Sequence, residues 1–115
     1  MNEIGWMVHG TEICRERVRR FNAQAEVDAN PLRLLRRLKW ELEWREYVLK
    51  MVNAGRVREL SPVGRVWWEY MRNKARLEIA WNDNEISETV FRVRSGHLRR
   101  RRDERLASMN KERAA

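Results

Sequence analysis

The chain has 115 residues and a formal net charge of +8, with 25 Lys and Arg residues against 17 Asp and Glu residues. This length accommodates one domain with a small core, and the excess of positive charge favours an anionic partner. One cysteine and two histidines exclude an internal disulfide and a zinc site built from soft ligands.

Five glycines, two prolines and little alternation of apolar and polar residues predict an all-α protein. We expect a three- or four-helix antiparallel bundle in residues 1–98, followed by a basic C-terminal arm, helical or disordered, in residues 99–115. No apolar run approaches the roughly 20 residues that span a bilayer, and the start MNEIGWMVHG lacks the order of a signal peptide. We therefore expect no membrane partner and a cytoplasmic location, or the host-cell cytoplasm or virion interior if the protein is viral.

Residues 3–27 carry an apolar stripe with alternating spacings of three and four, which predicts a first helix with one buried face. Gly5 and Gly10 each cost about 1 kcal/mol within a helix, so we expect its firm part to begin at Thr11. Cys14 lies on the stripe, where a buried structural thiol is a better explanation than a nucleophile. The stripe comprises Ile4, Met7, Thr11, Cys14, Val18, Phe21 and Ala25.

The stretch from Asn30 to Gly55 has the clearest helix signals and is the expected centre of the fold. Asn30 can cap the start, Pro31 needs no backbone donor at the first position, and Gly55 readily adopts the left-handed conformation that ends a helix. Arg45 interrupts the first of two apolar stripes. The first stripe is Leu35, Leu38, Leu42, Leu49 and Val52, and the second, on roughly the opposite side, is Trp40, Trp44, Tyr47 and Met51.

The second stripe leaves two interpretations open. In the first, both faces of the helix belong to the core. In the second, the tryptophan face is left for a second copy or another molecule, and Arg33, Arg36 and Arg37 extend it as a cationic half. Such a surface suits phosphates with stacked bases, and it equally suits an acidic protein groove.

Ser61 and Pro62 form a second cap and proline pair, which predicts a third helix that extends to Trp81. This helix also carries two apolar stripes. Two helices with two apolar faces each, in so short a chain, favour a dimer or a larger assembly. The stripes are Val63, Trp67, Tyr70, Leu77 and Trp81 on one side, and Trp68, Met71, Ala75 and Ile79 on the other.

Asn82, three residues before Glu85, has the spacing of a capping box and predicts the start of a fourth helix. His97 lies on an apolar stripe of this helix, and we interpret it as a hydrogen-bonded core or boundary residue. Ser95 and Gly96 either end the helix or bend it.

Arg99 to Arg102 are the most suggestive local signal for nucleic acid. Four consecutive arginines on a helix point in four directions, so they can reach phosphates on both sides of a groove. The alternative is a solvated tail in which Asp103 and Glu104 pair with Arg99 and Arg100.

Catalytic and sequence-reading motifs are missing from the chain. Met51 and Pro62 argue against a helix-turn-helix around Gly55, and there is no glycine-rich phosphate loop or nucleophile with a placed base. Most glutamates have a basic residue one turn away, as Glu41 has Arg45, and are explained as helix-surface pairs. We expect no enzyme activity, no cofactor and no metal.

The sequence therefore predicts a self-associating, non-enzymatic protein that binds nucleic acid, DNA or RNA, with low sequence specificity. The alternative is a protein-interaction module that inserts tryptophan side chains into an acidic protein surface. Such a module would be an inhibitor, an adaptor or an assembly subunit. In general build, a small helical chain rich in Trp and Arg resembles bacteriophage accessory proteins. The residues predicted to bind are Arg33, Arg36, Arg37, Trp40, Trp44, Arg56, Arg58, Arg99, Arg100, Arg101 and Arg102.

Overall fold

The computed structural model describes residues 2–25 and 32–114, and the regular structure in these ranges is helical throughout. The prediction of an all-α protein is confirmed, whereas the predicted cap at Asn30 and Pro31 lies outside the described residues. The elements are α1 (Glu3–Ala25), α2 (Leu32–Asn53), the short 3-10 helix η1 (Val57–Glu59), α3 (Pro62–Asn82) and α4 (Glu88–Ala114).

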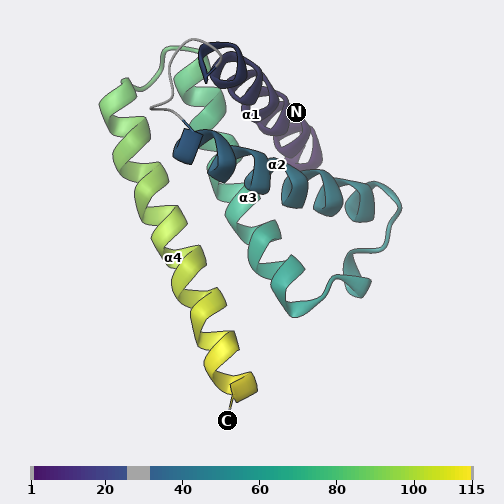
Figure 1. Cartoon of the computed structure of the whole chain (residues 1–115). Coiled ribbons are helices and arrows are strands. Elements are labelled where there is room, and N and C mark those ends of the chain that lie inside the picture. Colours follow the sequence, from purple (N-terminus) through teal and green to yellow (C-terminus); the bar gives the residue numbers. More distant parts are fainter. Residues whose placement is uncertain (1, 26–31, 115) are drawn as a thin grey trace.

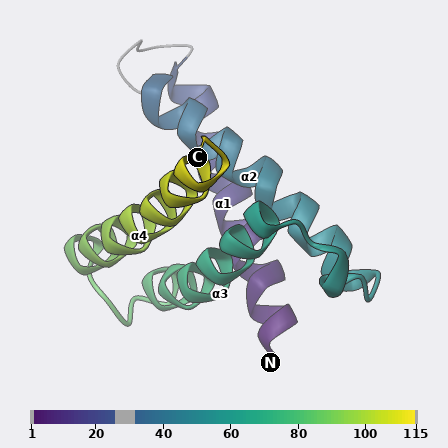
Figure 2. The ribbon, with the colours of Figure 1, turned by 90° about the horizontal axis from the view of Figure 1, so that it is seen from below.

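The centre of the fold is α3. It packs against α1, α2 and α4, whereas α4 brings its Cα atoms within 8 Å of α3 alone among the described helices. α3 and α4 run side by side in opposite directions, and α2 crosses α3 at a wide angle (Figures 1 and 2). The expectation that the 30–55 helix is central is therefore wrong. The residues on both apolar faces of α3 are buried or half-buried within the chain, and self-association stays a prediction.

Two of the predicted helix termini are confirmed. The Ser61 Oγ accepts a hydrogen bond from the Gly64 N–H at 3.0 Å, and Pro62 occupies the first position of α3. Gly55 adopts a left-handed conformation with φ of 69° just after the end of α2.

The predicted start of the fourth helix at Asn82 is wrong. Helix α3 continues through Asn82 and ends because Asn84 is left-handed, with φ of 60°, which lets the Glu85 N–H donate back to a carbonyl of α3 at 2.8 Å. The Ser87 Oγ then caps α4 by accepting from the Val90 N–H at 3.2 Å.

Helix α1 begins at Glu3, well before the firm start that was expected at Thr11. Gly10 lies where α1 crosses α3, and a Cβ on it would stand 2.8 Å from the Cβ of Ala75. The unfavourable helix propensity of this glycine is therefore offset by the close approach of two helices that it permits.

Helix α4 is continuous from Glu88 to Ala114, so it neither ends nor bends into a separate helix at Ser95 and Gly96. Residue 99, where the basic arm was expected to begin, lies inside this helix. The functional division into residues 1–98 and 99–115 stays a prediction.

The buried apolar residues form two clusters. The larger lies where α1, α2 and α3 meet, and the smaller lies between α1 and α2. Cys14 is fully buried as predicted, and burial raises the pKa of its thiol to about 11, which keeps it protonated and unreactive at neutral pH. The larger cluster is Met7, Val48, Val52, Trp67, Tyr70 and Met71, and the smaller is Val18, Leu35 and Leu38.

Candidate functional site

Four buried charged side chains connect α2 to α3. Arg45 donates to both carboxylate oxygens of Glu78, at 3.0 and 2.7 Å, and to the Thr11 hydroxyl of α1 at 3.2 Å. Lys74 donates to both oxygens of Glu41, at 2.7 and 2.9 Å. None of the four is more than 4% exposed. The interpretation of Glu41 and Arg45 as a helix-surface pair is therefore wrong.

The charges of this network keep one another ionised. Burial alone would raise the pKa of Glu41, but the ammonium of Lys74 and the guanidinium of Arg45 lower it to about 2. Burial alone would lower the pKa of Lys74, and the Glu41 carboxylate reverses this and raises it above its usual value. With two positive and two negative charges paired, the network holds the helices together.

The free energy of unfolding is expected to fall as the pH is lowered from about 4.5 to about 2. A carboxylate with a depressed folded-state pKa contributes stability that is present above its unfolded pKa and is lost as the pH falls through its folded pKa, here about 2 for Glu41. Urea unfolding followed by circular dichroism at about pH 6 and about pH 3, at constant ionic strength, measures this. An unchanged free energy of unfolding would contradict the depressed pKa of Glu41.

A cleft of about 550 Å³ opens beside the network, between α1, α2 and α4. It exists because α2 and α4 both pack on α3 without approaching each other closely. Helical spacings of three and four place Arg92, Ser95 and Arg99 in the same wall of α4. We call it the cationic cleft after its basic lining residues, which are Arg17, Arg20, Arg37, Lys74, Arg92 and Arg99.

Half of these six cations are paired with a carboxylate. The pairs are Lys74 with Glu41 at 2.7 Å, Arg92 with Glu88 at 3.0 Å and Arg20 with Glu16 at 3.5 Å. Arg17, Arg37 and Arg99 form no ion pair with any carboxylate in the described parts of the chain. The cleft therefore carries positive charge that its own walls do not neutralise.

The surroundings of Arg37 lower the pKa of its side chain. Its partial burial lowers the pKa of its guanidinium, and the nearby charge of Arg99 lowers it further, against an opposing effect of Glu41. The guanidinium carbon of Arg17 lies over the stacked rings of Trp81 and Phe91, 5.7 and 5.4 Å from their centres. Three guanidiniums from three helices thus gather around one opening, an arrangement that suits an anion.

Ser95 lies in the wall of the cationic cleft, with its hydroxyl oxygen buried. Its side chain is only 8% exposed, and its Oγ forms no hydrogen bond with any residue that the structure describes. This oxygen is itself closed off from the cleft, so the cations and not the hydroxyl define what the cleft can bind.

The predicted arginines at the start of α2 lie on the surface. Arg33 and Arg36 are exposed, and Arg37 is exposed at the rim of the cationic cleft, which it lines. Of the three, only Arg37 is brought close to the second predicted basic segment, through Arg99 of α4.

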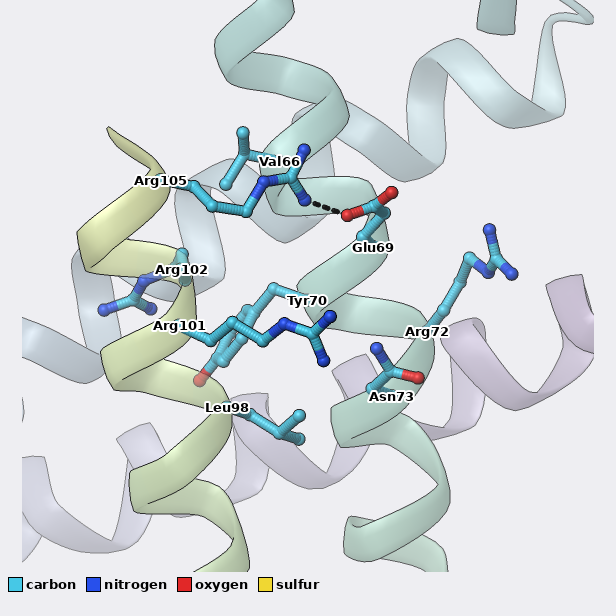
Figure 3. A pocket seen from close by; sticks show the side chains of 9 residues that line it. All are labelled: Val66, Glu69, Tyr70, Arg72, Asn73, Leu98, Arg101, Arg102 and Arg105. Atoms are coloured by element: carbon cyan, nitrogen blue, oxygen red, sulfur yellow. Dashed lines mark hydrogen bonds and ion pairs between the residues drawn. The ribbon is translucent and has the colours of Figure 1, made fainter. Parts of the chain in front are cut away.

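The arginines from 99 to 102 have different surroundings. Arg99 is half-buried and lines the cationic cleft, and Arg100 is exposed with its Nη2 at 3.2 Å from the Nδ1 of His97. Arg101 extends from α4 towards α3, over a hollow of about 230 Å³ (Figure 3). His97 is itself exposed, which excludes the predicted core position.

Arg102 is buried, and its guanidinium is enclosed by aromatic rings. It lies 4.4 Å from the ring centre of Trp67, 4.6 Å from Tyr70 and 5.4 Å from Trp40. It also donates from Nε to Asp103 at 2.9 Å, so Asp103 does not pair with Arg99 as one interpretation expected. In this structure the guanidinium is not open to a phosphate and instead joins α4 to α2 and α3.

The hollow between α3 and α4 is a poorer anion site than the cationic cleft. Arg105 pairs there with Glu69 across the two helices (Figure 3). Arg72 pairs with Glu3 of α1. Only Arg101 lines the hollow without an ion pair to a described carboxylate.

The predicted tryptophan face of α2 is partly core and partly surface. Trp44 is half-buried and stacks on Trp67 at 5.7 Å, whereas 43% of Trp40 and 41% of Tyr47 are exposed. Met51 is buried. The first interpretation, a core face, is therefore correct for Met51, and the second, a face left for a partner, stays a prediction for the exposed Trp40 and Tyr47. Trp40, Trp44 and Tyr47 line a shallow depression of about 390 Å³, which we call the aromatic depression.

Arg56 and Arg58 lie at the other end of α2, around η1, and neither lines the cationic cleft. Arg56 pairs with Glu59, and Arg58 is exposed. The structure therefore does not bring these two predicted residues together with Arg37 and Arg99.

The sequence did not single out Arg17 or Ser95 as residues that line a cleft. Ser95 precedes Arg99 by one turn, a spacing that is visible in the sequence, but nothing local shows which helices face that turn. Arg17 likewise acquires its place from the contact of α1 with its neighbours.

The fold and the site define a small all-helical protein with an unneutralised cationic cleft. Within the described residues, no helix is long and apolar enough to cross a membrane, and no three His, Cys, Asp or Glu side chains group as a metal site. No protein family, curated protein or solved structure matches this chain.

Proposed function

We propose that this protein binds nucleic acid with low sequence specificity by holding backbone phosphates at the cationic cleft. The observation that carries the proposal is the convergence of Arg37 and Arg99, one from each segment that the sequence marks as basic, with Arg17 around one opening. Phosphate contacts supply most of the affinity of non-specific binding and carry no sequence information.

The surroundings of the cleft support this proposal. Arg33 and Arg36 are exposed on the preceding turn of α2 and extend the positive surface beyond the opening. Trp40 follows Arg37 by three residues on the same helix and exposes 43% of its side chain, so a base can stack on it beside a bound phosphate.

The double variant Arg37→Gln/Arg99→Gln is expected to bind oligonucleotides more weakly than the unaltered protein. It removes two phosphate contacts, so the slope of log affinity against log salt should become shallower by about 1.4 to 1.8. Fluorescence anisotropy with labelled single-stranded and duplex oligonucleotides that end in hydroxyl groups, between 50 and 200 mM salt, measures both quantities.

The matched control is Arg58→Gln/Arg65→Gln, which removes the same charge from exposed positions outside the cleft. It is expected to keep most of the affinity and the salt slope. If the two double variants lose the same affinity and the same salt slope, the binding depends on net charge and not on the cleft. Absence of binding by the unaltered protein at 50 mM salt would overturn the proposal.

A second candidate function is docking on an acidic protein surface. The exposed rings of Trp40 and Tyr47 in the aromatic depression favour it, because Trp, Tyr and Arg dominate the binding energy of protein interfaces. The same experiment separates the two candidates, since a protein-docking module has no reason to bind oligonucleotides with a steep salt dependence.

A further inference from the structure

A second basic groove lies between α3 and α4, and no described residue of α1 or α2 lines it. Its volume is about 460 Å³, and it continues the hollow of Figure 3, with which it shares Asn73, Leu98 and Arg101. We call it the outer groove. Its arginines are Arg76 of α3 with Arg94 and Arg101 of α4, and all three are exposed.

The outer groove carries positive charge that its walls do not neutralise. None of its three arginines forms an ion pair with a carboxylate in the parts of the chain that the structure describes, and no Asp or Glu of those parts lines it. The cationic cleft, by contrast, is lined by Glu41 and Glu88. The half-buried Leu77 and Leu98 also line the outer groove, so it offers charge for phosphates and an apolar surface for sugars.

The outer groove and the cationic cleft lie on opposite sides of α3 and α4. The two openings have no described lining residue in common. Each arginine of the outer groove follows a cation of the cleft by two residues, and two residues turn a helix by about 200°. The three pairs are Lys74 with Arg76, Arg92 with Arg94 and Arg99 with Arg101. The two helices therefore present unneutralised charge in two opposed directions.

One segment of double-stranded DNA cannot fill both openings. The persistence length of the duplex is about 150 base pairs, so a duplex of about 20 base pairs does not fold around α4 from one opening to the other. If phosphates occupy the cationic cleft and the outer groove at the same time, they belong to two segments.

We propose that the outer groove holds a second nucleic-acid segment, so that one protein chain joins two segments. Arg76, Arg94 and Arg101 contact the phosphates of the second segment, while the first lies at the cationic cleft. This inference rests on the proposed function and adds a bridging activity to it. Because phosphate contacts carry no sequence information, the two segments need no sequence in common.

The first test is the capture of a free oligonucleotide by an immobilised one. Beads that carry a duplex of about 20 base pairs are saturated with the protein at 50 mM salt, washed, and given a labelled duplex of unrelated sequence. Oligothymidine strands, which do not pair with each other, are compared in the same way. The unaltered protein is expected to retain the label on the beads, and beads without protein are not.

The variant Arg76→Gln/Arg94→Gln is expected to reduce the retained label about ten-fold, because it removes two phosphate contacts from the outer groove alone. Its affinity for a single labelled duplex in solution should stay within about two-fold of that of the unaltered protein, because the cationic cleft is intact. The control Arg58→Gln/Arg65→Gln removes the same charge outside both openings and should keep the retained label.

A second groove variant guards against an effect on folding. The guanidinium carbon of Arg76 lies 4.8 Å from the ring centre of Trp6, so its replacement also removes a contact between α3 and α1. Arg94→Gln/Arg101→Gln leaves that contact in place and should reduce the retained label by the same factor. Circular dichroism verifies that both variants are folded.

A second measurement counts the strands bound per protein chain at saturation, by analytical ultracentrifugation of the complex. Two strands per chain are expected for the unaltered protein and one for Arg76→Gln/Arg94→Gln. The count does not depend on self-association, because a dimer that used one opening in each chain would join two strands with only one per chain. One strand per chain in the unaltered protein would overturn the inference.

The outcomes distinguish the two proposals. Tight binding of one strand without capture of a second, for duplexes and single strands alike, would overturn the bridging inference and leave the proposed function standing. Failure of the unaltered protein to bind any strand at 50 mM salt would overturn both. Capture that survives both groove variants would assign the joining of strands to associated copies of the protein and overturn the role of the outer groove.

Discussion

Replacing Arg45 with Met is expected to lower the free energy of unfolding by about 3 to 5 kcal/mol. Arg45 is fully buried and donates to both oxygens of Glu78, which is itself fully buried. The variant leaves the Glu78 carboxylate without its partner in the interior, where an uncompensated charge is costly. Urea unfolding followed by circular dichroism near pH 7 measures the change.

The control is the double variant Arg45→Met/Glu78→Leu, which removes the buried ion pair as a unit. Apolar residues of similar volume often replace such a pair at little cost, so the double variant should be considerably more stable than the single one. Thr11 still donates its hydroxyl to the Met7 carbonyl in both variants. If the single and double variants are equally destabilised, the lower free energy of unfolding comes from lost packing and not from an unpaired charge.

Replacing Gly10 with Ala is expected to lower the free energy of unfolding by about 1 to 3 kcal/mol, although alanine is the better helix former. The added Cβ would stand 2.8 Å from the Cβ of Ala75 and 2.9 Å from its Cα, so α1 and α3 must move apart. It would also stand 2.9 Å from the Nη2 of Arg45, at the edge of the buried charge network.

The same substitution at Gly96 provides the comparison. A Cβ on Gly96 has no atom within 4 Å, and the residue lies inside α4, so Gly96→Ala should raise the free energy of unfolding by about 0.5 to 1 kcal/mol. If Gly10→Ala lowers the free energy of unfolding and Gly96→Ala raises it, the close helix crossing at Gly10 is the cause of the difference. If both variants gain stability, α1 and α3 do not approach at Gly10 as the structure has them.

Signals that act over a few residues were sufficient to predict that the chain is helical and to place two of its helix termini. The pair Ser61 and Pro62, like Gly55, acts only on its immediate neighbours in the chain. These residues therefore predict helix termini whatever the rest of the fold is. The error at Asn82 has the same local origin. Asparagine serves at both ends of helices, and it is the left-handed backbone of Asn84, two residues later, that ends α3.

Periodicity predicted which positions share a face of a helix, but it did not predict what the face meets. Arg45 interrupts an apolar stripe and lies in the core because Glu78, 33 residues later, supplies its partner. Arg99 and Arg102 belong to one run of arginines, yet Arg99 lines the cationic cleft and Arg102 is buried among aromatic rings. A helix turns by about 100° per residue, so neighbours in the sequence face different parts of the molecule.

The sequence by itself determined that the chain is helical, that one helix ends near Gly55 and the next begins at Ser61 and Pro62, that Cys14 is buried and that the chain is strongly basic. These properties depend on propensity, capping and periodicity, which act within one or two turns. Only the tertiary structure decided that α3 is central, that the charges of Arg45 and Lys74 are interior, and that Arg17, Arg37 and Arg99 surround one cleft. Those outcomes depend on how helices distant in the sequence pack, because packing determines which side chains meet and which charges remain without a partner.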